Sequence, residues 1–259
     1  MTRIMAPAKL TLSLAVTGVR ADGYHELRSE MVSLSLSDEL TFTEGGTGLT
    51  FEADPGTRSE SLVDDGHNLI ARALVAVARR AAVHVIKRIP LGGGLGGGST
   101  DAAAVLRWAG CDDLHLARGL GSDVPFSVLG GRALVEGTGE RVTPLEFEGR
   151  QFLLLIPPFG INTARVYATW DDQGGADRSD SANALTDAAL TVEPRLARWR
   201  DALGDLVGLQ PTLAGSGSTW FVESGLPEVE TGGLGWLNRG DERARLVRAH
   251  TVPAGWNGG

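Results

Sequence analysis

A chain of 259 residues, 42% of them hydrophobic, can bury one large core or two modest ones. Its formal net charge of −8 argues against a broad basic surface for nucleic acid. No apolar run approaches the roughly 18 residues of a membrane span, and residues 1–10 lack the apolar stretch of a signal peptide. We therefore expect a cytoplasmic protein that binds neither nucleic acid nor membrane. The single cysteine, Cys111, is expected to be a partly buried apolar residue.

The first half of the chain begins with strand patterns. Apolar and polar residues alternate over 9–17, 32–36 and 40–42, and a further apolar pair follows at 49–51, which together predict a β-meander. From Asn68 to Ala82 the apolar spacing becomes helical, and Asp64, Asp65 and Asn68 are possible start signals. A short strand over 83–86 follows and ends before Pro90.

The second half continues with both kinds of element. The apolar run Phe152–Ile156 predicts a buried strand, and helical patterns follow over 163–170 and 185–203. Residue 213 and residues 219–222 flank a glycine turn at 215–217, and 244–250 predicts a last strand. The polar segment 171–181 predicts a mobile loop. Strands grouped with antiparallel-style turns, followed by helices, indicate an α+β fold rather than a doubly wound sheet.

The most informative stretch is IPLGGGLGGGSTDAAAVL, from Ile89 to Leu106. Six glycines lie between Gly92 and Gly98, here called the glycine loop, and without Cβ atoms their backbone N–H groups can converge on one anion. Ser99 and Thr100 then open an alanine-rich helix predicted over 99–109, whose N-terminus favours the same negative charge. The hydroxyls of these two residues can also reach a phosphate oxygen or a magnesium ion. The segment predicts a site for a polyphosphate.

Other interpretations of the glycine loop are weaker. A flexible linker rarely runs from an apolar strand straight into an uninterrupted helix. Gly92, Gly94 and Gly97 match the dinucleotide pattern GxGxxG, but Pro90 separates them from the strand and a meander precedes it. The sequence contains neither the GK[ST] of a Walker A loop nor the HRD and DFG motifs of protein kinases.

Candidate chemical groups lie in three other places. Asp123, in GSDVPF, is a candidate base for phosphoryl transfer, although an Asp after Gly-Ser is commonly a helix cap or turn residue. Lys9 is a candidate cation at the start of an apolar strand, although an ordinary surface lysine fits the same pattern. Tyr24 and His25, in a turn within DGYHEL, could stack on and hydrogen-bond a planar ring, or could be packing residues.

Taken together, these separated motifs are similar to those of the GHMP kinase superfamily. The resemblance covers almost the whole chain and rests on PAKLTLSLAVTGVRADGYHEL, the IPLGGGLGGGSTDAA loop, GSDVPF and LAGSGSTWFV. The RADGYHEL extension resembles the branch whose substrate is 4-diphosphocytidyl-2-C-methyl-D-erythritol. The resemblance implies an α+β fold with a ribosomal protein S5 domain 2-like domain over 1–148, a ferredoxin-like domain over 149–259, and the site between them.

The resemblance also implies roles for single residues. Asp123 would take the proton from the 2-hydroxyl of the substrate, and Lys9 would stabilise the nearby charge and orient Asp123. ATP and Mg²⁺ are the implied cofactors, and no metal ligand set is assigned. The residues implied to hold ATP are Asn68 and Lys87 near the adenine and Pro90, Gly92, Gly93, Gly94, Leu95, Gly96, Gly97, Gly98, Ser99 and Thr100 at the phosphates. Those implied to hold the cytidine substrate are Tyr24 and His25, Tyr167 on the opposite ring face, Thr163 near it, and Thr11, where the family usually has asparagine.

Two alternatives remain at this point. The chain could be a GHMP kinase for another alcohol, such as homoserine or mevalonate, and dependence on cytidine separates that case. It could also be a catalytically silent nucleotide-binding sensor, because a fold does not dictate activity. A monomer or weak homodimer is expected.

Overall fold

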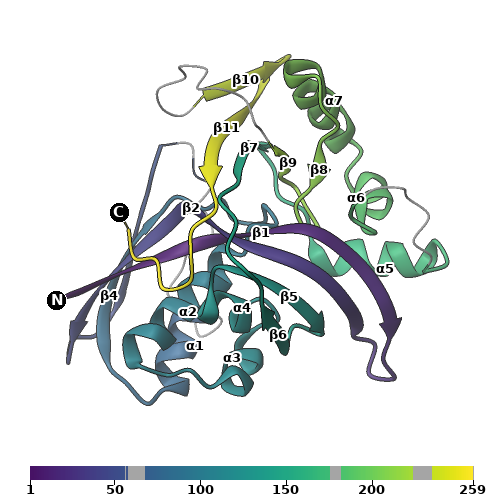
Figure 1. Cartoon of the computed structure of the whole chain (residues 1–259). Coiled ribbons are helices and arrows are strands. Elements are labelled where there is room, and N and C mark those ends of the chain that lie inside the picture. The colour runs from purple at the N-terminus through teal and green to yellow at the C-terminus, as the bar shows by residue number, and fades with distance from the viewer. Residues whose placement is uncertain (56, 58–67, 176–181, 224–234, 259) are drawn as a thin grey trace.

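The structure, a computed structural model, describes residues 1–55, 57, 68–175, 182–223 and 235–258. Two sheets dominate it (Figure 1): a six-stranded sheet of order β3-β4-β2-β5-β6, with β1 paired to β2, and a five-stranded sheet of order β10-β11-β7-β9-β8. Helices α1–α4 gather on one side of the first sheet, and α5–α7 lie beside the second. The α+β fold class predicted from the sequence is confirmed.

The bounds of these elements are as follows. The strands are β1 (Thr2–Val19), β2 (His25–Glu44), β3 (Leu49–Ala53), β4 (Ala81–Lys87), β5 (Arg132–Gly137), β6 (Arg141–Pro144), β7 (Gln151–Ile156), β8 (Thr212–Leu213), β9 (Trp220–Glu223), β10 (Gly235–Arg239) and β11 (Glu242–His250). The helices are α1 (Leu69–Ala76), α2 (Gly97–Ala109), α3 (Leu114–Leu120), α4 (Val124–Leu129), α5 (Thr163–Asp172), α6 (Thr186–Val192) and α7 (Arg195–Val207).

Strands β1 and β2 form one long antiparallel hairpin that crosses the whole molecule (Figure 1). The stretches predicted separately at 32–36 and 40–42 are parts of β2, whose other edge pairs with β5 over 27–32 and with β4 over 39–44. The predicted meander is therefore right for β1 and β2 and wrong for β3, which pairs in parallel with β4. The reason is burial, since β4 has a fully buried face and takes the inner position, whereas β3 is only partly buried.

Several predicted boundaries need correction. Asn68, a predicted start signal, caps α1, which begins at Leu69 but ends already at Ala76, because Ala78 adopts a φ of 51° and β4 begins at Ala81. The helix predicted over 185–203 is two helices, because Pro194 between α6 and α7 cannot donate a backbone hydrogen bond. Asp171 lies in the last turn of α5, which ends at Asp172, rather than starting a loop. Elements α3, α4, β5, β6 and β10 were not predicted, and Asp64, Asp65 and residues 176–181 lie outside the described residues.

The two sheets share a buried core and are also connected by backbone hydrogen bonds at both ends of the chain. Leu10, Leu34, Phe152, Leu154 and Phe221 belong to one buried cluster that joins the two sheets. At the far end of the hairpin, the backbone of Leu14 hydrogen-bonds to residues 182 and 184 before α6. The C-terminal segment returns to the first sheet, where the N–H of residue 252 donates to the carbonyl of residue 33. The chain passes from the first sheet to the second between β6 and β7, and the predicted boundary at 148 lies in this connection. The N-terminal hairpin and the C-terminal segment each also contact the other half of the chain.

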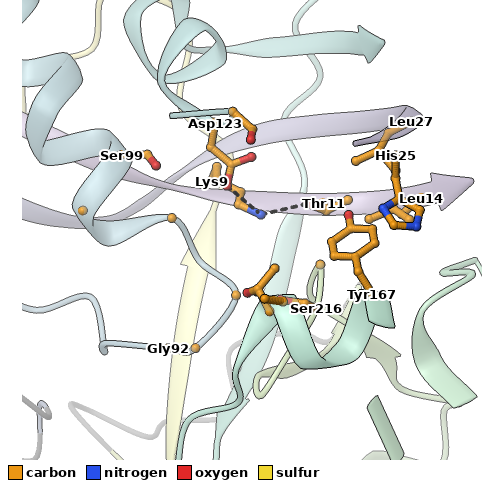
Figure 2. Close-up of a pocket in the computed structure, with 18 of the residues that line it drawn as sticks. Lys9, Thr11, Leu14, His25, Leu27, Gly92, Ser99, Asp123, Tyr167 and Ser216 are labelled. Atoms are coloured by element: carbon orange, nitrogen blue, oxygen red, sulfur yellow. Dashed lines mark hydrogen bonds and ion pairs between the residues drawn. The ribbon is translucent and has the colours of Figure 1, made fainter. Parts of the chain in front are cut away.

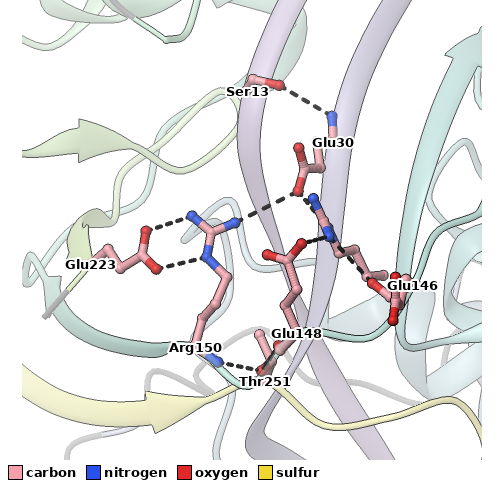
Figure 3. A network of polar contacts seen from close by, with 8 residues as sticks. Ser13, Glu30, Glu146, Glu148, Arg150, Glu223 and Thr251 are labelled. Carbon is pink, nitrogen blue, oxygen red and sulfur yellow. Dashed lines mark hydrogen bonds and ion pairs between the residues drawn. The ribbon is translucent and has the colours of Figure 1, made fainter. Parts of the chain in front are cut away.

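Charged side chains also connect the two sheets (Figure 3). Arg150, just before β7, donates to Glu223 of β9 at 2.7 Å and lies 3.6 Å from Glu30 of β2. Arg132 of β5 donates to Glu30 at 2.8 Å and also to Glu148. Single exposed pairs of this kind contribute about 0–1 kcal/mol, so we interpret the network mainly as fixing the orientation of one sheet against the other.

The longest described helices, α2 and α7, have 13 residues each. Across the described ranges, no helix has both the length and the apolar character that crossing a membrane requires.

Candidate active site

A cleft of about 880 Å³ lies between elements of the first sheet and its helices and elements that accompany the second sheet. Strands β1 and β2, the glycine loop and the start of α4 form one side of it, and α5 with the turn between β8 and β9 forms the other. Figure 2 shows Lys9 and Asp123 pointing toward each other, with His25 and Tyr167 together on the side away from Gly92. The Lys9–Asp123 pair and the His25–Tyr167 pair thus occupy different parts of the cleft.

The glycine loop is packed so closely that only glycine fits at two positions. Gly94 has a φ of +77°, and a Cβ on it would lie 2.1 Å from the carbonyl oxygen of Ala214. Gly96 has a φ of +71°, and its Cβ would lie 2.7 Å from Cγ of Lys9. Helix α2 begins at Gly97, two residues before the predicted start, so two glycines belong to its first turn. The first N–H groups of a helix have no partner within it, so they are available to an anion in the cleft.

The predicted phosphate-binding residues do not all reach the cleft. Pro90, the six glycines and Ser99 line it. The Leu95 side chain is buried, and its carbonyl accepts the N–H of Lys9 at 3.0 Å. The hydroxyl of Thr100 is turned away and donates to the carbonyl of Pro7 at 2.7 Å. Leu95 and Thr100 therefore fasten the loop to β1, and Ser99 is the member of the hydroxyl pair that faces the cleft.

Lys9 and Asp123 form an ion pair in the cleft. Lys9 lies within β1 with only 7% of its side chain exposed, so the alternative of a surface lysine is wrong. Its Nζ is 3.4 Å from Oδ2 of Asp123 and donates to Oγ1 of Thr11 at 3.2 Å. Asp123 occupies the N-cap position of α4, but its side chain makes no capping hydrogen bond and remains 29% exposed. The carboxylate is therefore held by the lysine and still accessible to a substrate.

The turn between β8 and β9 supports this pair from the second sheet. A Cβ on Gly215 would lie 3.2 Å from Nζ of Lys9, so the turn backbone packs against the ammonium. Asn183 holds the turn by donating to the carbonyls of residues 213 and 215 at 2.8 and 2.7 Å. Ser216 of the turn exchanges a 2.8 Å hydrogen bond with Thr163 at the start of α5.

Aromatic residues form the other end of the cleft. The ring centroids of His25 and Tyr167 are 4.7 Å apart with an interplanar angle of 34°, and Nε2 of His25 is 2.8 Å from Oδ1 of Asp171. Because these two rings touch, a nucleobase cannot lie between them, so the expected placement of Tyr167 on the opposite face of a base held by His25 is wrong in this structure. Tyr24 also lines the cleft and is 57% exposed. Burial and the charge of Asp123 raise the pKa of Tyr167, so its phenol stays neutral.

The two residues predicted near the adenine have other partners. Asn68 caps α1 by accepting the N–H of Ile70 at 2.9 Å, and its neighbour Leu69 lines the cleft. Lys87 is buried, and its ammonium is paired with the carboxylates of Asp38 and Asp101. The structure therefore does not bring the charge of Lys87 to the cleft.

Sequence reasoning missed several cleft residues: Ser122, Thr138, Asp171 and Ser216. Ser216 carried a signal in the second glycine turn, which resembles the first in composition. Asp171 was missed because the polar segment 171–181, which it begins, was predicted to be a mobile loop. The structure as described, with its gaps, holds no cluster of three acidic, histidine or cysteine side chains that could bind a metal. A magnesium ion in proteins often keeps several waters and phosphate oxygens as ligands, and beside the glycine loop the Ser99 hydroxyl would offer it a protein oxygen.

Comparison with known proteins identifies the family. The sequence profile described as the GHMP kinases N terminal domain matches residues 68–131. A 4-diphosphocytidyl-2-C-methyl-D-erythritol kinase of Dehalococcoides mccartyi is 36% identical, over 86% of this chain and 89% of that protein. A crystal structure of 4-(cytidine 5'-diphospho)-2C-methyl-D-erythritol kinase matches with a TM-score of 0.67 and 34% identity, covering 85% and 89% of the two chains.

More distant structures support the fold alone. The mevalonate kinase of Methanococcus jannaschii matches with a TM-score of 0.58 at 13% identity, over 97% of this chain and 98% of that one. The GHMP kinase fold expected from the motifs is confirmed, and the relatives at about one-third identity carry the cytidine-linked name rather than those of the other alcohol kinases. The chain belongs to the 4-diphosphocytidyl-2-C-methyl-D-erythritol kinase family of GHMP kinases.

Proposed function

We propose that this protein transfers the γ-phosphoryl group of ATP to the 2-hydroxyl of 4-diphosphocytidyl-2-C-methyl-D-erythritol, in the non-mevalonate route to isoprenoid precursors. The observation that carries the proposal is the Lys9–Asp123 pair, which faces the cleft between the glycine loop and the aromatic end. A phosphoryl donor and a cytidine-bearing acceptor can therefore meet at one carboxylate. The names of the relatives support the choice of acceptor.

The glycine loop would hold the triphosphate. Its backbone N–H groups and the N-terminus of α2 offer partial positive charge without a cluster of basic side chains, as a protein with a net charge of −8 requires. Ser99 adds a hydroxyl at the same place. Magnesium, when bound to the nucleotide, would neutralise charge on the β- and γ-phosphates.

Asp123 would accept the proton of the substrate hydroxyl as that oxygen bonds to the γ-phosphorus and the bond from phosphorus to the β-phosphate oxygen breaks. ADP leaves with the electrons of the broken bond, and the proton stays on the carboxyl group. Lys9, held by Thr11 and by the turn at Gly215, keeps Asp123 oriented and offsets negative charge beside it. Lys9 and Asp123 both belong to one chain, so the active site needs no second subunit, and the proposed state is a monomer or weak homodimer. The proposed location is the cytoplasm, where ATP is available.

A substrate assay tests the proposal directly. The purified protein is incubated with ATP, magnesium and one acceptor, and ADP release is followed with a coupled enzyme assay. We expect turnover with 4-diphosphocytidyl-2-C-methyl-D-erythritol and none above background with homoserine or mevalonate. Equal turnover with a plain alcohol would favour a different GHMP kinase, and ATP binding without transfer to any acceptor would favour the sensor.

Removing the Tyr24 ring tests the aromatic end of the cleft. Stacking of a base on an aromatic ring contributes about 1–3 kcal/mol, so Tyr24→Ala should raise KM for the cytidine substrate by about tenfold or more. KM for ATP and kcat should change by less than about threefold, since Tyr24 is proposed to contact the cytidine and not the nucleotide or the reacting hydroxyl. Tyr24→Phe is the matched control, because it keeps the ring and should behave like the wild type. An unaltered KM in Tyr24→Ala would remove the stacking role.

A further inference from the structure

We propose that Arg118 of α3 is a positioning residue for the cytidine end of the cleft. It would hold Tyr24 in the orientation that receives the base, and it would do so from outside the cleft. The inference rests on the proposed function and adds a determinant of substrate affinity. Arg118 does not line the cleft itself, while Tyr24 and Thr138, which it contacts, both do.

Two hydrogen bonds to Thr138 hold one edge of the Arg118 guanidinium group in place. Its Nε and Nη2 both donate to Oγ1 of Thr138, at 3.0 and 2.8 Å. Its Cζ lies over the Tyr24 ring, 5.6 Å from the centroid, within the range of a cation–π interaction. No carboxylate of the described ranges lies within ion-pair distance of Arg118. Glu140 is joined to Arg118 only through the shared Thr138 hydroxyl, so among the described residues no direct ion pair competes with the contact between Arg118 and the Tyr24 ring.

Thr138 is itself fixed by the turn between β5 and β6. Its backbone N–H and its hydroxyl donate to Oε2 of Glu140, at 2.7 and 2.8 Å. Gly137, at a φ of +71°, leaves the space that this carboxylate occupies, because a Cβ there would lie 2.1 Å from Oε1 of Glu140. A Cβ on Gly139 would lie 2.1 Å from the carbonyl of Ser122, so the turn packs beside Asp123. Arg118 is thus anchored to the same rigid part of the molecule as the proposed base.

The hydrogen bonds within residues 20–24 fix the backbone of Tyr24 but not its ring, so the ring needs another contact to set its orientation. The carbonyl of Tyr24 accepts the N–H of Arg20 at 2.8 Å, and its N–H donates to the Asp22 side chain at 3.2 Å. Tyr24 as a whole is 57% exposed. A ring whose one face rests on a guanidinium can stack a base only with its other face. The orientation is then set before the substrate arrives, which lowers the entropy cost of binding.

The test compares substrate affinity in variants at positions 118 and 24. Arg118→Ala should raise KM for the cytidine substrate by about three- to tenfold, as expected for a partly exposed cation–π contact and the lost ordering of the ring. KM for ATP and kcat should stay within about twofold. Arg118→Met keeps the packing of the side-chain stem without the charge and should show the same effect, which guards against a folding defect. The matched control is Arg243→Ala, which removes a guanidinium 4.4 Å from the ring of Trp236, an aromatic residue outside the cleft.

A double-mutant cycle decides whether Arg118 acts through Tyr24. In the Tyr24→Ala background, Arg118→Ala should raise KM no further. Calorimetric titration of cytidine diphosphate gives the same comparison without turnover, so the inference can be tested even if the proposed reaction fails. A raised KM in Tyr24→Ala together with wild-type values in both Arg118 variants would overturn the inference and leave the proposed function standing. Equal effects of Arg118→Ala in both backgrounds would also overturn it.

Discussion

Replacing Asp123 by asparagine is expected to lower kcat by about 10²–10⁴-fold, the range typical of a lost general base. Asparagine has nearly the same shape and can still accept a hydrogen bond from Lys9, but it cannot take the substrate proton at neutral pH. Lys9 lies 3.4 Å from this carboxylate, whereas Asp171, which also lines the cleft, pairs with His25 at the aromatic end and is not in place to replace it. KM for both substrates should change little, because Asp123 acts on the hydroxyl that accepts the phosphoryl group. It does not contact the cytosine or the adenine in the proposed arrangement.

Steady-state kinetics on both variants check this expectation. Ser122→Ala is the matched control, since Ser122 lines the cleft next to Asp123 and carries no charge. Thermal unfolding of each variant should be measured alongside, because Asp123→Asn removes the negative charge that pairs with the nearly buried Lys9. A kcat within a few-fold of the wild type, in a folded Asp123→Asn protein, would exclude Asp123 as the base.

The backbone features of the site could be predicted from the sequence because they depend on local residue types. A run of glycines followed by a helix-forming segment specifies a loop and a helix N-terminus wherever it stands. Gly94 and Gly96 show why, because their positive φ angles and close contacts exclude other residues. The alternation of Leu10, Leu12 and Leu14 likewise predicted β1, although not its full length.

Side-chain direction could not be predicted in the same way. Ser99 and Thr100 are adjacent hydroxyl residues with the same local pattern, yet only Ser99 faces the cleft. The difference is tertiary, because the Thr100 hydroxyl meets a carbonyl of β1, 93 residues earlier in the chain. His25 and Asp171 are paired across 146 residues, and no spacing in the sequence contains that contact.

Lys87 shows the same limit most clearly. Its position was expected near the adenine, whereas the structure uses its ammonium to connect Asp38 of β2 with Asp101 of α2 under the glycine loop. A Cβ on Gly97 would lie 3.5 Å from Nζ of Lys87, so the start of α2 rests on the lysine. Asp38 also accepts the N–H groups of Arg88 and Ile89, at 2.5 and 2.8 Å, at the entrance to the loop. The three charged residues therefore join β2, β4 and α2 at the base of the proposed phosphate site.

The pKa values of this buried group follow from one ammonium between two carboxylates. Burial alone would lower the pKa of Lys87, but the charges of Asp101 and Asp38 raise it, so the lysine stays protonated. Burial raises the pKa of Asp101 to about 7 against the opposing effect of Lys87, and the charge of Asp38 contributes to the increase. Oδ1 of Asp101 finds no hydrogen-bond donor within the described part of the chain, which is consistent with this increase. Between its ordinary value of 3.8 and about 7, Asp101 binds a proton more strongly in the folded state, so this group makes the free energy of unfolding fall as pH rises.

Lys87→Met should therefore destabilise the protein by about 3–5 kcal/mol at pH 8, because it leaves two buried carboxylates without their cation. The loss should be smaller at pH 5.5, where Asp101 is protonated in the folded state and only one buried charge remains uncompensated. Urea unfolding of wild type and variant at the two pH values measures both quantities. The matched control is Lys87→Met with Asp101→Asn, which removes one of the two carboxylates and should recover part of the loss at pH 8. A loss that is equal at both pH values would mean that packing of the lysine stem, rather than its charge, supports the glycine loop.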